Sequence, residues 1–203
     1  MAAVPTAIRS ARRSLPDVAD LEALGRQQGL DAVGVAAAEP FATTRRHLER
    51  RKAAGLHGGM AFTYRRPDRS SDPGAALPGA RALVVGARSY RRTSVAAVDV
   101  EVRRSGEPAP PGGRVARYAW EDHYGPLREA LVVVAGRLRA EGWRARVVAD
   151  DNALVDREAA YRAGLGWYGK NANLLLPGEG SWFVLGTVIT DAPLAPAGAR
   201  VDD

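Results

Sequence analysis

RAGLGWYGKNANLLLP, residues 162–177, is the stretch that most constrains the fold of this 203-residue chain. Its glycines, Gly164, Gly166 and Gly169, satisfy the pattern G-x-G-x-x-G. In dinucleotide-binding folds that pattern follows a strand and opens a helix, so that the pyrophosphate rests on the helix N-terminus. The identity of the flanking elements therefore decides whether the pattern has that meaning here.

The flanking residues are in the opposite order. Residues 153–163 are rich in Ala, Leu, Glu and Arg, which predicts a helix with Asn152 or Asp151 as its N-cap. Gly164 is the expected left-handed residue that ends it. Residues 173–176 then predict a strand, so the glycines lie in a helix-to-strand turn.

A second nucleotide-binding pattern is present but lacks a residue and a helix that the site requires. Residues 164–170 also fit G-x-x-x-x-G-K, but Asn171 stands where a phosphate-binding loop needs Ser or Thr for magnesium, and no helix follows. Both nucleotide interpretations are set aside. For the residues alone, the remaining interpretation is a glycine-rich turn with Trp167 packed as a lid.

Outside this stretch, apolar periodicity and turn residues predict helices alternating with short strands. The expected helices cover residues 17–28, 40–55, 60–66 and 122–141, and the expected strands 31–37, 81–88, 144–149 and a last one ending near residue 190. That last strand can pair with residues 173–176 as a hairpin across PGEGS. The fold class is α/β, with a layered mixed sheet and flanking helices.

One main domain is expected. Its predicted limits are residues 17–192, preceded by a disordered basic leader at 1–16. Residues 91–113 contain SGEPAPPGG and predict a mobile surface loop. Residues 193–203 are interpreted as a linker or domain exit.

The composition is that of a soluble globular protein, with 46% hydrophobic and 26% charged residues. No apolar run approaches the ~18 residues needed to span a bilayer, and no secretion signal is recognisable. A cytoplasmic protein without membrane contact is expected. The net charge of +6 permits a polyanionic partner without requiring one.

The chain contains no cysteine, so it supplies no thiolate ligand for zinc or for an iron–sulfur cluster. Its three histidines show no metal-ligand spacing. We therefore predict no metal site formed by side chains of this chain.

Asp150 and Asp151 follow a predicted strand, at the end where α/β proteins often bind ligands. Either could act as a general acid, or one could cap the following helix. Arg157 could hold an anionic ligand or form an intrahelical ion pair.

Five collinear segments resemble the epoxyqueuosine reductase family. The longest, residues 149–194, contains an aspartate before a helix, the loop G-L-G-W-x-G-K-N and the triplet G-S-W. The other segments are GLHGGMAFTYRRPDRSSDP, LPGARALVV, SYRR and RVARYAWEDHYGPLREAL. Together the resemblance covers roughly residues 20 to 194.

This resemblance implies a base-off cobalamin-binding domain, related in fold to nitroreductase-like domains. The implied reaction reduces epoxyqueuosine to queuosine at the tRNA wobble position. Asp150 matches the family's proton-donating aspartate. The positions implied to contact cobalamin are Arg69, Val155, Asp156, Arg157, Lys170, Asn171 and Leu174.

This sequence departs from the family pattern in three places. The chain ends at Asp203, before the expected cysteine motifs, so iron–sulfur clusters are expected only if a further C-terminal region exists. Ser70 replaces the usual arginine, with Arg69 displaced by one, and His123 precedes Tyr124 where the family has the reverse order.

These departures leave several functional interpretations open. The chain is the cobalamin-binding part of a reductase, supplied with electrons by an external donor or an iron–sulfur partner. Alternatively, it is a stand-alone corrinoid-binding or carrier module. A weaker alternative is a tRNA-binding or structural relic.

Overall fold

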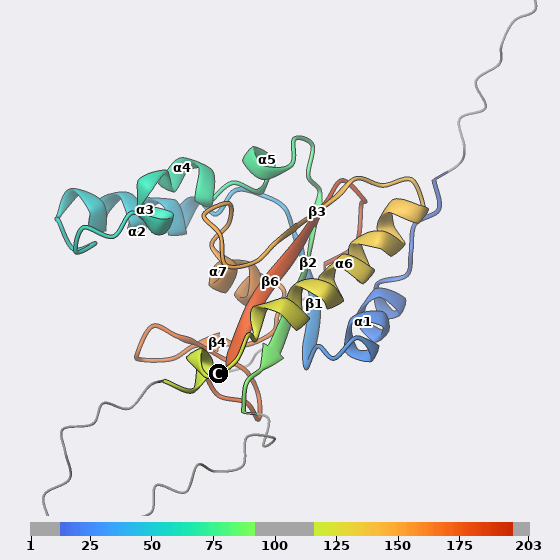
Figure 1. The fold of residues 1–203 in the computed structure, drawn as a ribbon. Coiled ribbons are helices and arrows are strands. Elements are labelled where there is room, and N and C mark those ends of the chain that lie inside the picture. Colours follow the sequence, from blue (N-terminus) through green and yellow to red (C-terminus); the bar gives the residue numbers. More distant parts are fainter. Residues whose placement is uncertain (1–12, 92–115, 197–203) are drawn as a thin grey trace, which may run out of the picture.

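The computed structural model describes residues 13–91 and 116–196, and within them a central four-stranded sheet in the order β1-β2-β6-β3. Every pairing in this sheet is antiparallel. The strands are β1 (Ala32–Ala37), β2 (Ala82–Ser89), β3 (Ala145–Val148) and β6 (Phe183–Thr190). Figure 1 shows β6, the last strand in the sequence, running between β2 and β3.

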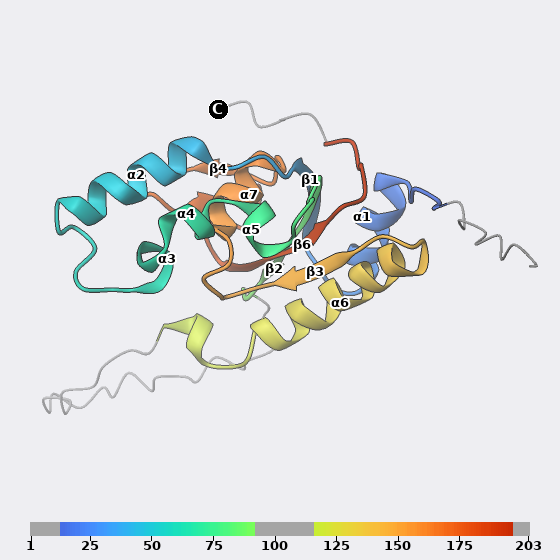
Figure 2. The ribbon, with the colours of Figure 1, turned by 90° about the horizontal axis from the view of Figure 1, so that it is seen from above.

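Helices cover both faces of the sheet (Figure 2). Helices α1 (Val18–Gln27) and α6 (Tyr124–Ala140) pack on one face, and α7 (Asp156–Arg162) packs on the other. The remaining helices are α2 (Ala42–Ala53), α3 (Phe62–Arg65), α4 (Pro67–Ser70), α5 (Pro73–Ala76) and the 3-10 turn η1 (Arg117–Ala119). A separate two-stranded ribbon joins β4 (Trp167–Tyr168) to β5 (Leu174–Leu175).

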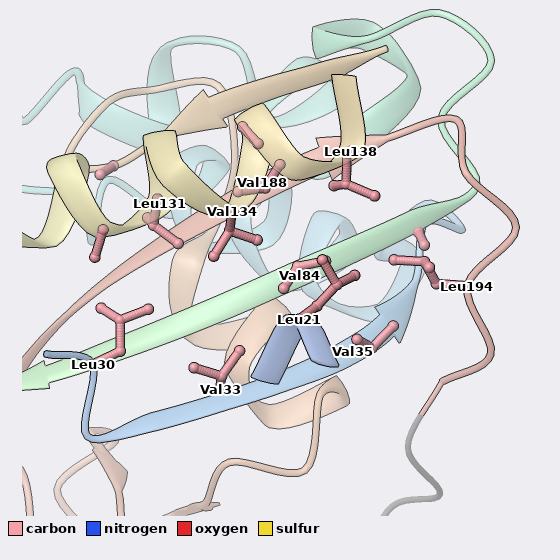
Figure 3. Close-up of a cluster of buried hydrophobic side chains, with 14 of the residues drawn as sticks. Leu21, Leu30, Val33, Val35, Val84, Leu131, Val134, Leu138, Val188 and Leu194 are labelled. Atoms are coloured by element: carbon pink, nitrogen blue, oxygen red, sulfur yellow. The ribbon is translucent and has the colours of Figure 1, made fainter. Parts of the chain in front are cut away.

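The core beneath α6 is an aliphatic layer (Figure 3). Leu131, Val134 and Leu138 recur at helical spacing along α6 and are fully buried against Val84 and Val188 of the sheet. Burial of each such side chain contributes roughly 1.5–3 kcal/mol. This layer fixes the position of α6, whose N-terminal end lies at the candidate site.

Two glycines allow α6 to approach the sheet closely. Gly86 of β2 and Gly186 of β6 face each other in register. A Cβ atom at Gly186 would lie 2.6 Å from a methyl carbon of Leu131, and one at Gly86 would lie 2.8 Å from a methyl carbon of Leu30. The leucines occupy the space that larger residues would fill.

The predicted layered α/β architecture is confirmed, with corrections in detail. The expected mixture of parallel and antiparallel pairs is wrong for the described strands, because β6 inserts between β2 and β3 and alternates the strand directions. The expected hairpin across PGEGS is also wrong. Only an isolated bridge joins Leu176 to Gly180, and β5 pairs with β4 while β6 pairs with β2 and β3.

The helix predicted for residues 153–163 begins later, at Asp156, with Val155 as its N-cap. Asp151 does accept a hydrogen bond from the Ala153 amide, but within a turn that precedes the helix. The end of helix α7 is as predicted, because Gly164 follows the C-cap residue Ala163 with a φ of 70°.

The outer segments are described only in part. The expected leader falls mostly outside the described residues, although the Ser14 carbonyl accepts a 2.7 Å hydrogen bond from the Trp143 indole. The expected loop at 91–113 lies outside them except for Arg91. Leu194, at the start of the expected linker, is buried in the α6 core. No helix among residues 13–91 and 116–196 is long and apolar enough to cross a bilayer.

Candidate ligand cavity beside the β3–α7 loop

The candidate site is organised by the loop that connects β3 to α7. Its second residue, Asp150, is exposed and has a φ of 53°, in the left-handed region that residues other than glycine rarely adopt. The loop is fixed at both ends. Arg128 of α6 donates a 2.9 Å hydrogen bond to the Ala149 carbonyl. The Ser70 hydroxyl donates to the Asn152 carbonyl at 2.8 Å, and the Val155 amide donates to the Ser70 carbonyl at 2.9 Å.

A cavity of about 550 Å³ opens beside this loop. Its walls combine aromatic and aliphatic side chains with a few carboxylates and hydrogen-bonding groups. The lining residues are Leu48, Phe62, Thr63, Tyr64, Tyr90, Tyr124, Asp150, Leu154, Val155, Asp156, Arg157, Tyr168, Ala172, Asn173, Leu174, Ser181, Phe183, Val184 and Leu185. A cavity of this size and mixed lining is typical of a small-molecule site.

The environment of Asp156 raises the pKa of its carboxyl group. Burial raises the pKa of Asp156 well above its usual range, and the negative charges of Asp151 and Asp150 act in the same direction, against the lowering effect of Arg157. Asp156 therefore favours its protonated form, whereas Asp150 is exposed at the cavity edge. Two carboxyl groups in one cavity thus have different environments.

The pKa values of two cavity tyrosines, Tyr124 and Tyr168, are raised. Burial, followed by the charges of Asp150 and Asp156, raises the pKa of Tyr124 to about 12. Burial and the charge of Glu158 likewise raise the pKa of Tyr168 to about 12. Both hydroxyls remain protonated at neutral pH. The Tyr168 hydroxyl donates a 3.4 Å hydrogen bond to a carboxylate oxygen of Glu158, whereas the Tyr124 hydroxyl can donate to a ligand.

The glycine-rich turn forms another wall. Arg157 donates hydrogen bonds from one nitrogen to the Ala172 carbonyl, at 2.9 Å, and to the Asn173 side-chain oxygen, at 3.3 Å. The Asn171 side chain accepts a 3.1 Å bond from the Asn173 amide. Arg157 therefore acts at least partly as a support for this turn.

The turn itself is a close backbone crossing. A Cβ atom at Gly166 would lie 1.9 Å from the Leu175 carbonyl oxygen, so only glycine fits between β4 and β5. Helix α7 precedes the turn and β5 follows it, which confirms the order used to set aside the nucleotide-binding patterns. Trp167 is half-buried and pairs with Leu175 as part of β4.

The structure brings together five of the eight sequence-predicted site residues. Asp150, Val155, Asp156, Arg157 and Leu174 all line the cavity. The other three lie elsewhere.

Of these three, Arg69 lines a neighbouring cavity. Lys170 and Asn171 are exposed on the glycine-rich turn and line neither cavity, although the next two residues, Ala172 and Asn173, line the first. Among the described residues, no cluster of three or more His, Asp or Glu side chains is arranged to hold a metal ion.

Sequence reasoning missed most of the aromatic wall. Tyr90 comes from the SYRR segment, and Tyr124 from the segment in which His123 and Tyr124 are exchanged. Both segments carry the family resemblance, but no role was predicted for either tyrosine, and both line the cavity. Phe183 and Ser181 follow the bend after residue 180. Alternation along β6 places its side chains on the two faces, but only the sheet order shows which face meets the cavity.

The fold and cavity define a layered α/β ligand-binding domain with an acidic and aromatic site at one end of its sheet. No family model matches the chain. An epoxyqueuosine reductase from Xanthomonas campestris pv. campestris is 35% identical over 195 residues, which cover 91% of this chain and 52% of the relative. The chain thus spans about half the length of that relative.

Solved structures agree with this similarity. An epoxyqueuosine reductase bound to an epoxyqueuosine-modified tRNA-Tyr stem loop matches 91% of this chain and 48% of its own, with a TM-score of 0.74 and 25% identity. A reductive dehalogenase whose structure is linked to B12-dependent dehalogenation covers 95% of this chain with a TM-score of 0.54 and 19% identity, and shares its fold. Over about nine tenths of its length, this chain is therefore similar in sequence and in fold to members of the epoxyqueuosine reductase family.

Proposed function

We propose that this chain is the cobalamin-binding part of an epoxyqueuosine reductase, which reduces the epoxide of epoxyqueuosine to give queuosine at the wobble position of tRNA. The observation that carries the proposal is the cavity. It combines an exposed Asp150, an Asp156 whose pKa is raised and an aromatic wall in a chain that resembles this family. Support for the cofactor comes from the fold shared with the B12-dependent dehalogenase.

The residues of the cavity fit a corrinoid. A corrin is a broad, largely apolar ring with amide side chains around its edge. Val155, Leu174 and Phe183 offer apolar contact area, and Asn173 and Ser181 offer polar groups at the rim. Within the part of the chain that the structure describes, the lining includes no His or Met side chain. Lys170 and Asn171 remain candidate contacts to the part of the ring that extends past the rim.

When bound, cobalamin would supply electrons to the substrate at a reactive metal centre. Conversion of the epoxide to the alkene of queuosine releases its oxygen as water, which consumes two electrons and two protons. The charge that develops on the oxygen must be neutralised by proton transfer. Asp150 is the proposed donor, because it lies at the cavity edge within reach of solvent, which can return its proton after each cycle.

Asp156 and Tyr124 would donate hydrogen bonds to the substrate, while Asp150 transfers the proton. The raised pKa of Asp156 favours its protonated form relative to an ordinary carboxyl, and in that form it can donate a hydrogen bond. Tyr124 does the same. The pair would orient a bound oxygen atom, whereas Arg157 holds the glycine-rich wall in place.

Electrons would come from outside these residues, because the chain has no cysteine with which to ligate an iron–sulfur cluster. An external donor or an iron–sulfur partner is therefore part of the proposal. The alternative is a corrinoid-binding or carrier module without reductase activity, and it shares the same cavity. The two differ in turnover and not in cofactor binding.

Cobalamin titration of the purified chain tests the shared part of the proposal. We expect a saturable change in the corrin absorption spectrum, weakened by filling the cavity with Leu174→Trp and unchanged in Arg137→Met, which alters only an exposed arginine paired with Glu141. A spectrum that stays unchanged at saturating protein would exclude both the enzyme and the carrier.

Turnover separates the enzyme from the carrier. With a chemical reductant and an epoxyqueuosine-containing stem loop, wild type should form queuosine. Asp150→Asn should lose about 10²-fold or more of that rate while retaining cobalamin affinity. Asn tolerates left-handed backbone, so the loop conformation is preserved. Normal turnover in this variant would remove Asp150 from its proposed role, and cobalamin binding without any wild-type turnover would favour the carrier.

A further inference from the structure

A second cavity, of about 580 Å³, adjoins the first and has the opposite electrostatic character. Four arginines contribute to its walls, and none of its lining residues is acidic. The lining residues are Phe62, Arg65, Arg66, Arg69, Ser70, Ala75, Ala76, Arg146, Asn152 and Ala153. This concentration of guanidinium groups marks a site for an anion with several charges.

Two of the four arginines are uncommitted. Arg66 forms a bidentate pair with Asp68, at 2.8 and 3.1 Å, and Arg146 donates to the Ala76 carbonyl at 2.7 Å. The guanidinium groups of Arg65 and Arg69 have no hydrogen bond or ion pair in the described part of the chain. Both are on exposed residues at the cavity wall, where they are free to bind a ligand.

The two cavities are neighbours across one loop. Phe62 lines both. The β3–α7 loop contributes Asp150 and Leu154 to the first cavity and Asn152 and Ala153 to the second. A ligand that enters the first cavity with an anionic extension can therefore place that extension among the arginines.

The basic surface continues along a helical arm, defined here as residues 42–70 and containing α2, α3 and α4. Figure 1 shows this arm extending away from the sheet. It carries eight basic and two acidic side chains, a net charge of +6 that equals the net charge of the whole chain. Helix α2 has no buried residue, so it contributes little to the core. Such an arrangement favours binding of an extended polyanion.

We infer that the second cavity, with the adjoining arm, binds the phosphodiester backbone of the RNA next to the nucleotide that is processed in the first cavity. Naming RNA as the partner rests on the proposed function. A single phosphodiester in the nucleotide tail of cobalamin has the same chemistry. The four arginines and the charge of the arm exceed what one such group would neutralise, and they match a run of phosphates.

The test compares two charge-matched double variants of the chain. Arg65→Gln/Arg69→Gln removes the uncommitted arginines, and Arg26→Gln/Arg137→Gln removes two exposed arginines that pair with Glu22 and Glu141 on the other side of the fold. Binding of a tRNA anticodon stem loop is measured against salt concentration. The cavity variant should bind about tenfold or more weakly, and the slope of log affinity against log salt should fall by about 0.7–0.9 per lost phosphate contact. The control should change by less than about twofold.

A gain-of-binding variant sharpens the test. Asp68→Asn releases Arg66 from its ion pair and removes a negative charge, so RNA binding should become roughly threefold tighter or more. Equal weakening of RNA binding in the two double variants, or no tightening in Asp68→Asn, would overturn the inference.

Cofactor titrations distinguish the two phosphate sources. Cobalamin and cobinamide, which lacks the nucleotide tail, are titrated into wild type and Arg65→Gln/Arg69→Gln. Equal affinities in both proteins, with RNA binding lost, support the RNA assignment. Selective loss of cobalamin over cobinamide, with RNA binding intact, overturns it in favour of the cofactor tail. Wild type that binds no cobalamin contradicts the proposed function by itself, whereas the RNA comparison still decides this inference.

Discussion

Arg128 donates a hydrogen bond from its guanidinium group to the carbonyl oxygen of Ala149, at 2.9 Å, and so ties helix α6 to the residue before the proposed proton donor. The same guanidinium lies 5.6 Å from the ring centre of Tyr124, another cavity residue. Through Arg128, the packed core beneath α6 fixes both the acidic loop and part of the aromatic wall. The position of the site therefore depends on a contact between elements that are adjacent in space and separate in sequence.

Arg128→Met should lower the free energy of unfolding by about 1–3 kcal/mol, because it removes a charge-assisted hydrogen bond and leaves the Ala149 carbonyl without this donor. Urea denaturation measures the change. Arg137→Met changes an arginine of the same helix that forms an exposed ion pair with Glu141. It should lower the free energy of unfolding by less than about 1 kcal/mol. Equal losses for the two variants would mean that the tether to the loop has no special importance.

The backbone of Asp150 gives a second prediction. Its φ of 53° tolerates Asn, and a β-branched residue is a strong misfit there. Asp150→Val should therefore destabilise the fold by about 1–2 kcal/mol, and Asp150→Asn should change stability by less than about 0.5 kcal/mol. Thermal and urea denaturation of the two variants provide the comparison. If Val is tolerated as well as Asn, the left-handed conformation is not maintained in solution.

The raised pKa of Asp156 predicts a pH dependence with a definite sign. The folded state holds this proton more tightly than the unfolded state, whose carboxyl has a pKa of about 4. The associated stability is thus complete below pH about 4 and is lost as pH rises toward the folded pKa. Asp156→Asn lacks this loss, so its stability relative to wild type should increase as pH rises above about 4.

Asp68 should show the opposite pH dependence. Both dependences are measured by urea denaturation of wild type and variant at a series of pH values. The hydrogen-bonded ion pair with Arg66 lowers the pKa of Asp68 to about 2. Its contribution is present above the unfolded pKa and is lost as pH falls toward about 2. The difference between wild type and Asp68→Asn should therefore decrease on acidification. A difference between wild type and Asp156→Asn that stays flat at all pH values above about 4 would show that the pKa of Asp156 is not raised in solution.

The sequence predicted the elements whose signals are local. Asp17 caps α1 with a hydrogen bond to the Ala19 amide, and Gly164 ends α7, as expected from residue type alone. Pairing was less predictable, because β6 is paired on both edges by strands far away in sequence. PGEGS resembles a hairpin turn, but the long-range pairing of β6 with β2 takes precedence over the local one.

The site was predictable to the extent that it lies in one segment. Five predicted residues fall within 150–174 and meet at the cavity. Tyr90, Tyr124 and Phe183 reach it from the end of β2, from α6 and from β6, and nothing in their spacing reveals this convergence. Arg69 was assigned to the same site but lines the neighbouring cavity, because α4 contacts the far side of the β3–α7 loop through Ser70.

The glycine-rich turn gives the last prediction, which separates backbone crowding from general sensitivity to substitution. Gly166→Ala places a methyl group 1.9 Å from the Leu175 carbonyl oxygen, so β4 and β5 must separate. Overpacking of this kind costs about 1–3 kcal/mol. It should also weaken cobalamin binding, because Ala172 and Asn173 of the displaced turn line the cavity.

Gly136→Ala is the matched control for this variant. A Cβ atom there meets no atom within 4 Å, and the residue lies inside helix α6, so alanine should raise stability by about 0.5–1 kcal/mol without affecting the cofactor. Urea denaturation and cobalamin titration of both variants measure the two effects. If Gly166→Ala is as stable as wild type and binds cobalamin normally, the close crossing of β4 and β5 is not what shapes this wall, and the glycines of residues 162–177 need another explanation.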